Sequence, residues 1–79
     1  MNILEQAKEI TSKVSIGMRK NQVVDILGEP DDISIYKRNR PFVYKYKDVE
    51  LHFDKGENPK LWMIYAEDEN HNPIFSLRI

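Results

Sequence analysis

The strongest constraint on the fold comes from residues 16–30, IGMRKNQVVDILGEP, because this segment specifies a short helix at both of its ends. With Arg19 as the N-cap residue, Met18 and Val23 stand at the two positions that form a hydrophobic staple. Gln22, at the third helical position, can reach back to a backbone N–H that the helix leaves without a partner. The start of the helix is therefore marked twice.

The apolar face and the end of this helix are also well defined. Val23, Ile26 and Leu27 recur at i, i+3 and i+4, which gives the helix one apolar stripe. Gly28 follows, and glycine supplies the left-handed conformation that commonly ends a helix. Pro30 prevents the helix from resuming, so a different element is expected to begin after it.

A longer amphipathic helix is predicted upstream, within residues 1–14. Its apolar positions recur at spacings of four, three and four residues, while charged side chains occupy the other face. These apolar positions are Ile3, Ala7, Ile10 and Val14, and Leu4 is expected to widen the stripe. We interpret them as core contacts, because the polar face is not predominantly basic, as it is in membrane-surface helices. Residues 15–17 separate the two helices.

From Ile33 onward the apolar period changes from 3.6 to 2, which is typical of β-strands. Lys47 and Asp48 form a two-residue connection, so the second and third strands are expected to make a tight hairpin. The alternating segments are residues 33–35, 42–46, 49–53, 61–66 and 74–79.

The fourth of these strands is apolar on both sides. Strict alternation places Leu61, Met63 and Tyr65 on one side. Trp62 and Ile64 then fall on the other side. A strand of this kind is expected at the centre of a sheet, or with its second face covered by a helix or a partner.

Together these patterns predict a single α+β domain over residues 1–79. Two N-terminal helices are expected to pack on one face of a four- to five-stranded antiparallel meander sheet. A chain of 79 residues buries only about 60% of the surface of its extended form, so the core is expected to be thin. The sequence has no cysteine, so stability must come from packing or association and not from a disulfide or a thiolate metal site.

The sequence also bears on location. No segment approaches the ~20 consecutive apolar residues that are needed to span a bilayer. Residues 1–14 carry charges among their apolar positions and lack the continuous apolar stretch of a signal peptide. We therefore expect a cytoplasmic protein without a membrane role.

Gly17-Met18, Val23 and the run LGEP at residues 27–30, followed by short strands, resemble the pattern of the SmpA/OmlA (BamE-like) superfamily. The resemblance implies the two-helix-plus-sheet scaffold that is also that of the beta-lactamase inhibitor proteins. Arg19 stands where the family usually has Ser or Thr, and the acylated cysteine of outer-membrane members is absent. The resemblance therefore implies a small, non-catalytic bacterial domain that presents a sheet face and loops to another protein.

Residue patterns that carry chemistry do not point to an enzyme. His52 and His71 are the only histidines, and neither stands at a spacing that zinc sites use. The acidic turn at residues 67–73 lacks the central glycine of a calcium loop and is interpreted as a solvated turn. Nucleophile-elbow and phosphate-loop motifs are also missing. We expect no catalytic residues, no metal and no cofactor.

Residues 36–47 combine basic and aromatic side chains and contain no acid. Such a hairpin could follow a nucleic-acid strand, with cations on phosphates and aromatic rings stacked on bases, so a nucleic-acid-binding module is the alternative function. However, the aromatic residues alternate at strand period and are expected to face the core. The net charge of −1 also makes nucleic acid the less favoured partner.

The leading hypothesis is a protein-binding domain, of the immunity or inhibitor type, that acts through its sheet face and loops. Its expected partner is another protein, such as a toxin or an enzyme, and a homodimer through an edge strand is a second form of association. Aromatic and arginine side chains are the usual anchors of protein interfaces. The candidate binding residues are Tyr36, Arg38, Arg40, Tyr44, Trp62 and Tyr65.

Overall fold

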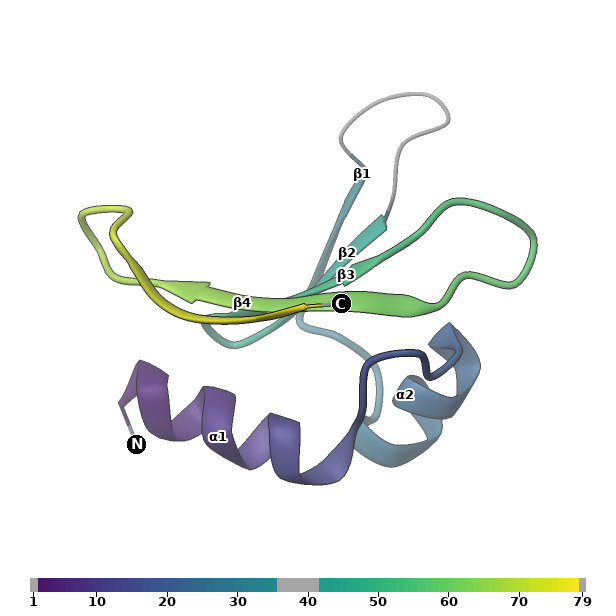
Figure 1. Cartoon of the computed structure of the whole chain (residues 1–79), viewed down its shortest axis with the longest axis horizontal. Helices are drawn as coiled ribbons and strands as arrows, with labels where there is room; N and C mark the ends of the chain where they lie inside the picture. The colour runs from purple at the N-terminus through teal and green to yellow at the C-terminus, as the bar shows by residue number, and fades with distance from the viewer. Residues whose placement is uncertain (1, 36–41, 79) are drawn as a thin grey trace.

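A computed structural model describes residues 2–35 and 42–78 of the chain. It confirms the predicted α+β class, with two helices followed by a five-stranded antiparallel sheet (Figure 1). The sheet is a simple meander in the order β1-β2-β3-β4-β5. The elements are α1 (Ile3–Lys13), α2 (Lys20–Leu27), β1 (Asp32–Ile35), β2 (Phe42–Tyr46), β3 (Val49–Phe53), β4 (Leu61–Glu67) and β5 (Pro73–Arg78).

Helix α1 begins at a side-chain cap. The Asn2 side chain accepts a hydrogen bond from the backbone N–H of Glu5 at 2.8 Å, which satisfies one of the donors that a helix start leaves unpaired. The predicted apolar stripe is confirmed at Ala7, Ile10 and Val14, which are buried, but Leu4 is 39% exposed and does not widen it. Within residues 2–35 and 42–78, no helix is both long enough and apolar enough to span a membrane.

Helix α2 starts as predicted but presents a different apolar face. The backbone N–H of Arg19 donates to the Gln22 side chain at 3.0 Å. Val23 is fully buried, whereas Ile26 is 47% exposed, so its assignment to the apolar stripe was wrong. The buried arc of this short helix is centred near Leu27, and successive helical residues lie about 100° apart, which turns Ile26 away from the sheet.

Gly28 ends α2 with a conformation that only glycine adopts readily. Its φ is 85° and its ψ is −172°, so it is extended with positive φ and is not the left-handed helical residue that the sequence pattern predicts. Its N–H donates to the carbonyl of Val24 at 2.7 Å and closes the last turn. The chain then leaves in the direction of β1.

Residues 17–20 run beside the start of β4 and tie the helices to the sheet. The N–H of Gly17 donates to the carbonyl of Leu61 at 2.7 Å, and the N–H of Leu61 donates to the carbonyl of Met18 at 2.7 Å. Lys20 donates to the carbonyl of Pro59 at 2.9 Å. We call this set of hydrogen bonds the 17–61 bridge. It fixes where α2 begins and where β4 begins at the same time.

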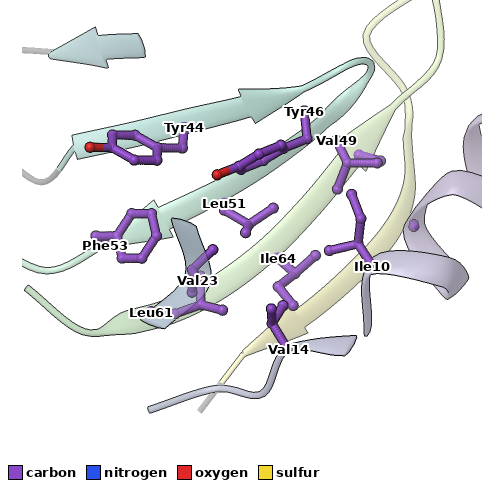
Figure 2. Close-up of a cluster of buried hydrophobic side chains, with 12 residues drawn as sticks. Ile10, Val14, Val23, Tyr44, Tyr46, Val49, Leu51, Phe53, Leu61 and Ile64 are labelled. Carbon is purple, nitrogen blue, oxygen red and sulfur yellow. The ribbon is translucent and has the colours of Figure 1, made fainter. Parts of the chain in front are cut away.

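The core lies between the helices and one face of the sheet (Figure 2). Tyr44 and Phe53 meet there edge to face, with ring centroids 5.2 Å apart. Tyr46 donates its hydroxyl to the carbonyl of Gly28 at 2.9 Å, and burial, followed by nearby Tyr44, Glu29 and Asp31, raises the pKa of Tyr46 to about 12. The labelled side chains are Ile10, Val14, Val23, Tyr44, Tyr46, Val49, Leu51, Phe53, Leu61 and Ile64.

A β-bulge in β4 overturns the predicted facing of that strand. Phe53 pairs with Leu61 and His52 pairs with Met63, so Trp62 is the extra residue in β4. Leu61 and Ile64 are both buried under the helices, although strict alternation placed them on opposite sides. The bulge therefore moves Trp62 and Met63 together to the opposite face. Sequence alternation could not show an inserted residue.

The position of the bulge can be tested by deleting single residues of β4. Deleting Met63 closes the bulge, because Trp62 then alternates with Leu61 and Ile64, and it leaves Leu61, Ile64 and Ala66 on the core face, so we expect a loss of only about 1–2 kcal/mol in unfolding free energy. Deleting Tyr65 instead turns Ala66 outward and Glu67 into the core, and we expect the domain to unfold. Urea titration monitored by circular dichroism measures both variants. Equal losses for the two deletions would contradict this account of the bulge.

Candidate protein-binding face

The sheet face opposite the two helices is the candidate site, and we call it the open face. Both described helices lie on the other side of the sheet (Figure 1). Strand register aligns two rows of side chains across the open face. One row runs through Lys45, Glu50, Tyr65 and Ser76, and the next through Val43, His52, Met63 and Arg78, with Trp62 beside Met63 in the bulge.

His52 is the centre of an aromatic cluster on this face. Its ring lies 6.0 Å from the ring of Trp62 and 6.4 Å from the ring of Tyr65, in both cases edge to face. All three side chains are partly exposed. Trp62 faces the open side together with Met63, because the bulge places these two consecutive residues of β4 on the same face. The cluster thus depends on two neighbouring strands and on the irregularity between them.

A carboxylate fixes the orientation of His52. Nε2 of His52 lies 2.9 Å from Oε1 of Glu50, two residues away on the same strand face. Both side chains are largely covered, with 13% of His52 and 20% of Glu50 exposed. The imidazole therefore presents a fixed ring edge between the two larger aromatic rings.

A second chain of hydrogen bonds connects β4 to the following turn. The Tyr65 hydroxyl donates to Oε2 of Glu67 at 2.9 Å, and Nδ1 of His71 lies 2.9 Å from Oε1 of the same carboxylate. The hydrogen bonds from His71 and Tyr65 lower the pKa of Glu67. The Glu67 carboxylate in turn raises the pKa of His71, and its hydrogen bond raises the pKa of Tyr65.

The acidic turn after β4 uses its own oxygens internally. Oδ1 of Asp68 accepts the backbone N–H groups of Asn70 at 2.8 Å and Asn72 at 2.9 Å, which lowers the pKa of Asp68. His71 adopts a positive φ of 65° within this turn. Among residues 2–35 and 42–78, no group of three or more His, Cys, Asp or Glu side chains is arranged to hold a metal ion.

The open face is hollowed next to β5. A depression of about 450 Å³ lies over β3, β4 and β5. Ser76 pairs with Tyr65 and is the smallest of the side chains that line the hollow. Carboxylates of Glu50 and Glu67 and the guanidinium of Arg78 line it, together with His52, Met63, Tyr65 and Pro73.

The structure separates the sequence-predicted binding residues into three groups. Trp62 and Tyr65 lie together on the open face. Tyr44 is 9% exposed and packs on Phe53, so it is a core residue and its assignment as a surface anchor was wrong. Tyr36, Arg38 and Arg40 lie outside the described residues.

Sequence reasoning missed His52 as a member of the cluster. His52 was placed on the polar side of its strand beside Glu50, which is where it lies, but nothing in the sequence indicated that Trp62 would face it. Alternation placed Met63 on the side of Tyr65, where it lies, but it also placed Leu61 on that side and Trp62 on the other, and the bulge reverses both. A run of five apolar residues, from Leu61 to Tyr65, was the available signal that simple alternation failed there.

Comparisons with protein-family models, with curated proteins and with solved structures give no match for this chain. The resemblance of residues 17–30 to the BamE-like superfamily therefore stays a prediction.

The contact between His71 and Glu67 is expected to raise the pKa of His71, and this change can be measured. Since the neighbouring carboxylate favours the imidazolium, we expect His71 to titrate above the ordinary value of about 6.5. Its stabilising effect is complete below the ordinary pKa of histidine and is lost as the pH rises through the raised one. Glu67→Gln is expected to return the pKa of His71 toward the ordinary value, as measured by NMR titration of the imidazole.

Glu69→Gln is the matched control, because it removes a carboxylate from an exposed residue of the same turn. It is expected to leave most of the elevation in the pKa of His71. Equal effects of Glu67→Gln and Glu69→Gln would show that the general negative charge of the turn, and not the hydrogen bond, raises this pKa.

Proposed function

We propose that this protein is a small, non-catalytic protein-binding domain whose binding surface is the open face. The observation that carries the proposal is the cluster of His52, Trp62 and Tyr65 on a sheet face opposite both described helices. An immunity- or inhibitor-type role in the bacterial cytoplasm is the specific form that we favour. The small size of the domain and the resemblance of residues 17–30 to the BamE-like superfamily support that form.

The chemistry of the cluster suits a protein interface. Trp and Tyr combine large apolar area with few rotatable bonds, so they lose little conformational entropy on binding. Charged groups lie close to the rings, since Glu50, Glu67 and Arg78 line the same hollow as His52 and Tyr65. An apolar centre with a polar rim is the usual anatomy of a protein interface.

The fold does not need Trp62 to fill its core. Leu61, Ile64 and Ala66 supply the buried positions of β4 and are 0% exposed, while Trp62 stands on the opposite face. Its large side chain therefore lies outside the packing between helices and sheet. This separation supports a role in recognition and makes Trp62 suitable for mutation.

The same geometry supports a non-catalytic role. His52 is bonded to Glu50, and the hydroxyl of Tyr65 is bonded to Glu67, so these polar groups hold one another in place. This arrangement favours a fixed recognition surface.

The nucleic-acid alternative loses two of its stacking residues. Tyr44 and Tyr46 are each 9% exposed and face the helices, as their alternation predicted, so they are not available to bases. Lys20 lies over Phe42, with Nζ 4.9 Å from the ring centroid, so that ring face is also occupied. Binding of a protein is therefore the better supported function.

The proposal is tested by capture followed by affinity measurement. The tagged protein is used to capture a partner from a lysate of the source bacterium, and the captured protein is then purified. We expect a stoichiometric complex, and we expect Trp62→Ala to weaken it by about 2 kcal/mol or more, which is ~30-fold in Kd. Isothermal titration calorimetry provides the constants.

Leu4→Ala is the matched control, because it truncates an exposed apolar side chain on α1, in the layer opposite the open face. It is expected to leave the Kd unchanged, and thermal unfolding checks that both variants are folded. The open face is the wrong surface if Trp62→Ala and Tyr65→Ala bind as tightly as the unmodified protein. If the tagged domain captures RNA or DNA and binds it more tightly than any captured protein, the alternative function is favoured.

A further inference from the structure

The two outer strands of the sheet differ in how their free edges are protected. In the order β1-β2-β3-β4-β5, β1 and β5 each pair on one side only within the described residues. Free edges invite pairing with another strand, and proteins usually block them with short strands, charges, prolines or bulges. The presence or absence of these devices shows which edge is available.

The β1 edge carries such protection. The described strand begins with Asp32, whose Oδ1 accepts the N–H of Ile33 at 2.9 Å. A carboxylate therefore stands where an added strand would have to begin, and it already engages one backbone donor.

The β5 edge has an uncharged centre. Between Pro73 and Arg78 the sequence is Ile-Phe-Ser-Leu, which favours β-structure and contains no acid or lysine. Ile74 is 39% exposed and Leu77 is 42% exposed, although both belong to an ordered strand. Protection is confined to Pro73 and the adjoining bulge at one end.

We propose that β5 pairs antiparallel with β5 of a second copy of this chain, with the two-fold axis at Ser76. The two sheets then form one continuous sheet, with both pairs of helices on the same side. On the helix side, Leu77 of each copy lies opposite Phe75 of the other, which covers the exposed Leu77. The proposal is independent of the proposed function.

This register is also complementary in charge. In this register Arg78 of each copy lies opposite Ile74 of the second copy, and Glu67 lies one strand further on, where it pairs with Pro73, the residue next to Ile74. Two strand spacings are about 10 Å, a distance that the arginine and glutamate side chains span together. The two-fold axis repeats this pairing, so each Arg78 gains a carboxylate of the other copy.

The helices leave room for this arrangement. Figure 1 shows α1 running along the underside of β4. In the continuous sheet the two β4 strands are separated by three strand spacings, about 14 Å, whereas packed helices need 8–10 Å between their axes. The two α1 helices therefore do not collide, and the space between them receives Leu77 and Phe75.

Charge substitution at the axis tests the register. Ser76→Lys places two like charges directly opposite each other, and we expect it to weaken dimerisation by at least about tenfold, as does Ser76→Glu. An equimolar mixture of the two variants is expected to restore the dimer. Sedimentation equilibrium from about 1 μM to about 500 μM is expected to give the unmodified chain a mass of twice 9.4 kDa at the upper end.

Ile33→Lys on β1 is the control, because it adds a charge at a side chain that is 50% exposed on the other outer strand. It is expected to keep the dimer. A monomer at all concentrations, or a dimer that Ser76→Lys leaves intact, overturns the proposal. Dimer loss in Ile33→Lys alone assigns the contact to β1 instead.

Trp62→Ala distinguishes this proposal from the proposed function. Trp62 lies in the bulge of β4 and not on the β5 edge, so the variant is expected to dimerise normally. A normal dimer with lost partner binding supports both inferences. A monomer that still binds its partner through Trp62 overturns the dimer alone.

Discussion

Everything in this structure depends on burying one face of the sheet under two helices. β4 is central to this burial, because its residues Leu61, Ile64 and Ala66 are all fully buried against the helical layer. Their spacing of three and two does not fit an uninterrupted strand, and the bulge at Trp62 reconciles it with the sheet. The candidate binding face is a consequence of that adjustment.

The 17–61 bridge connects this adjustment to the most recognisable part of the sequence. Gly17 and Met18 exchange backbone hydrogen bonds with Leu61, the residue immediately before the bulge. Gly17 has a φ of 98°, a conformation that other residues adopt at a cost. The segment that begins α2 therefore also holds the first residue of β4, and Trp62 follows directly from that fixed point.

Exposure divides the aromatic residues by role. Tyr44, Tyr46 and Phe53 belong to the core between sheet and helices. Trp62 and Tyr65 surround His52 on the other side, where Glu50 and Glu67 orient the polar atoms. A domain of this size has few large side chains, so placing two of them outside its core is the feature that most favours recognition of a partner.

The sequence by itself determined the order and kind of the elements, since the staple at Met18, the stop at Gly28 and the change of apolar period at Ile33 are local signals. It also determined the hairpin at Lys47 and Asp48, because a two-residue connection fixes the register. Only the tertiary structure decided the facing of residues where the local pattern is broken. The facing of Ile26, Leu61 and Trp62 was settled by packing between elements distant in sequence, and residue spacing within one element carries no information about that packing.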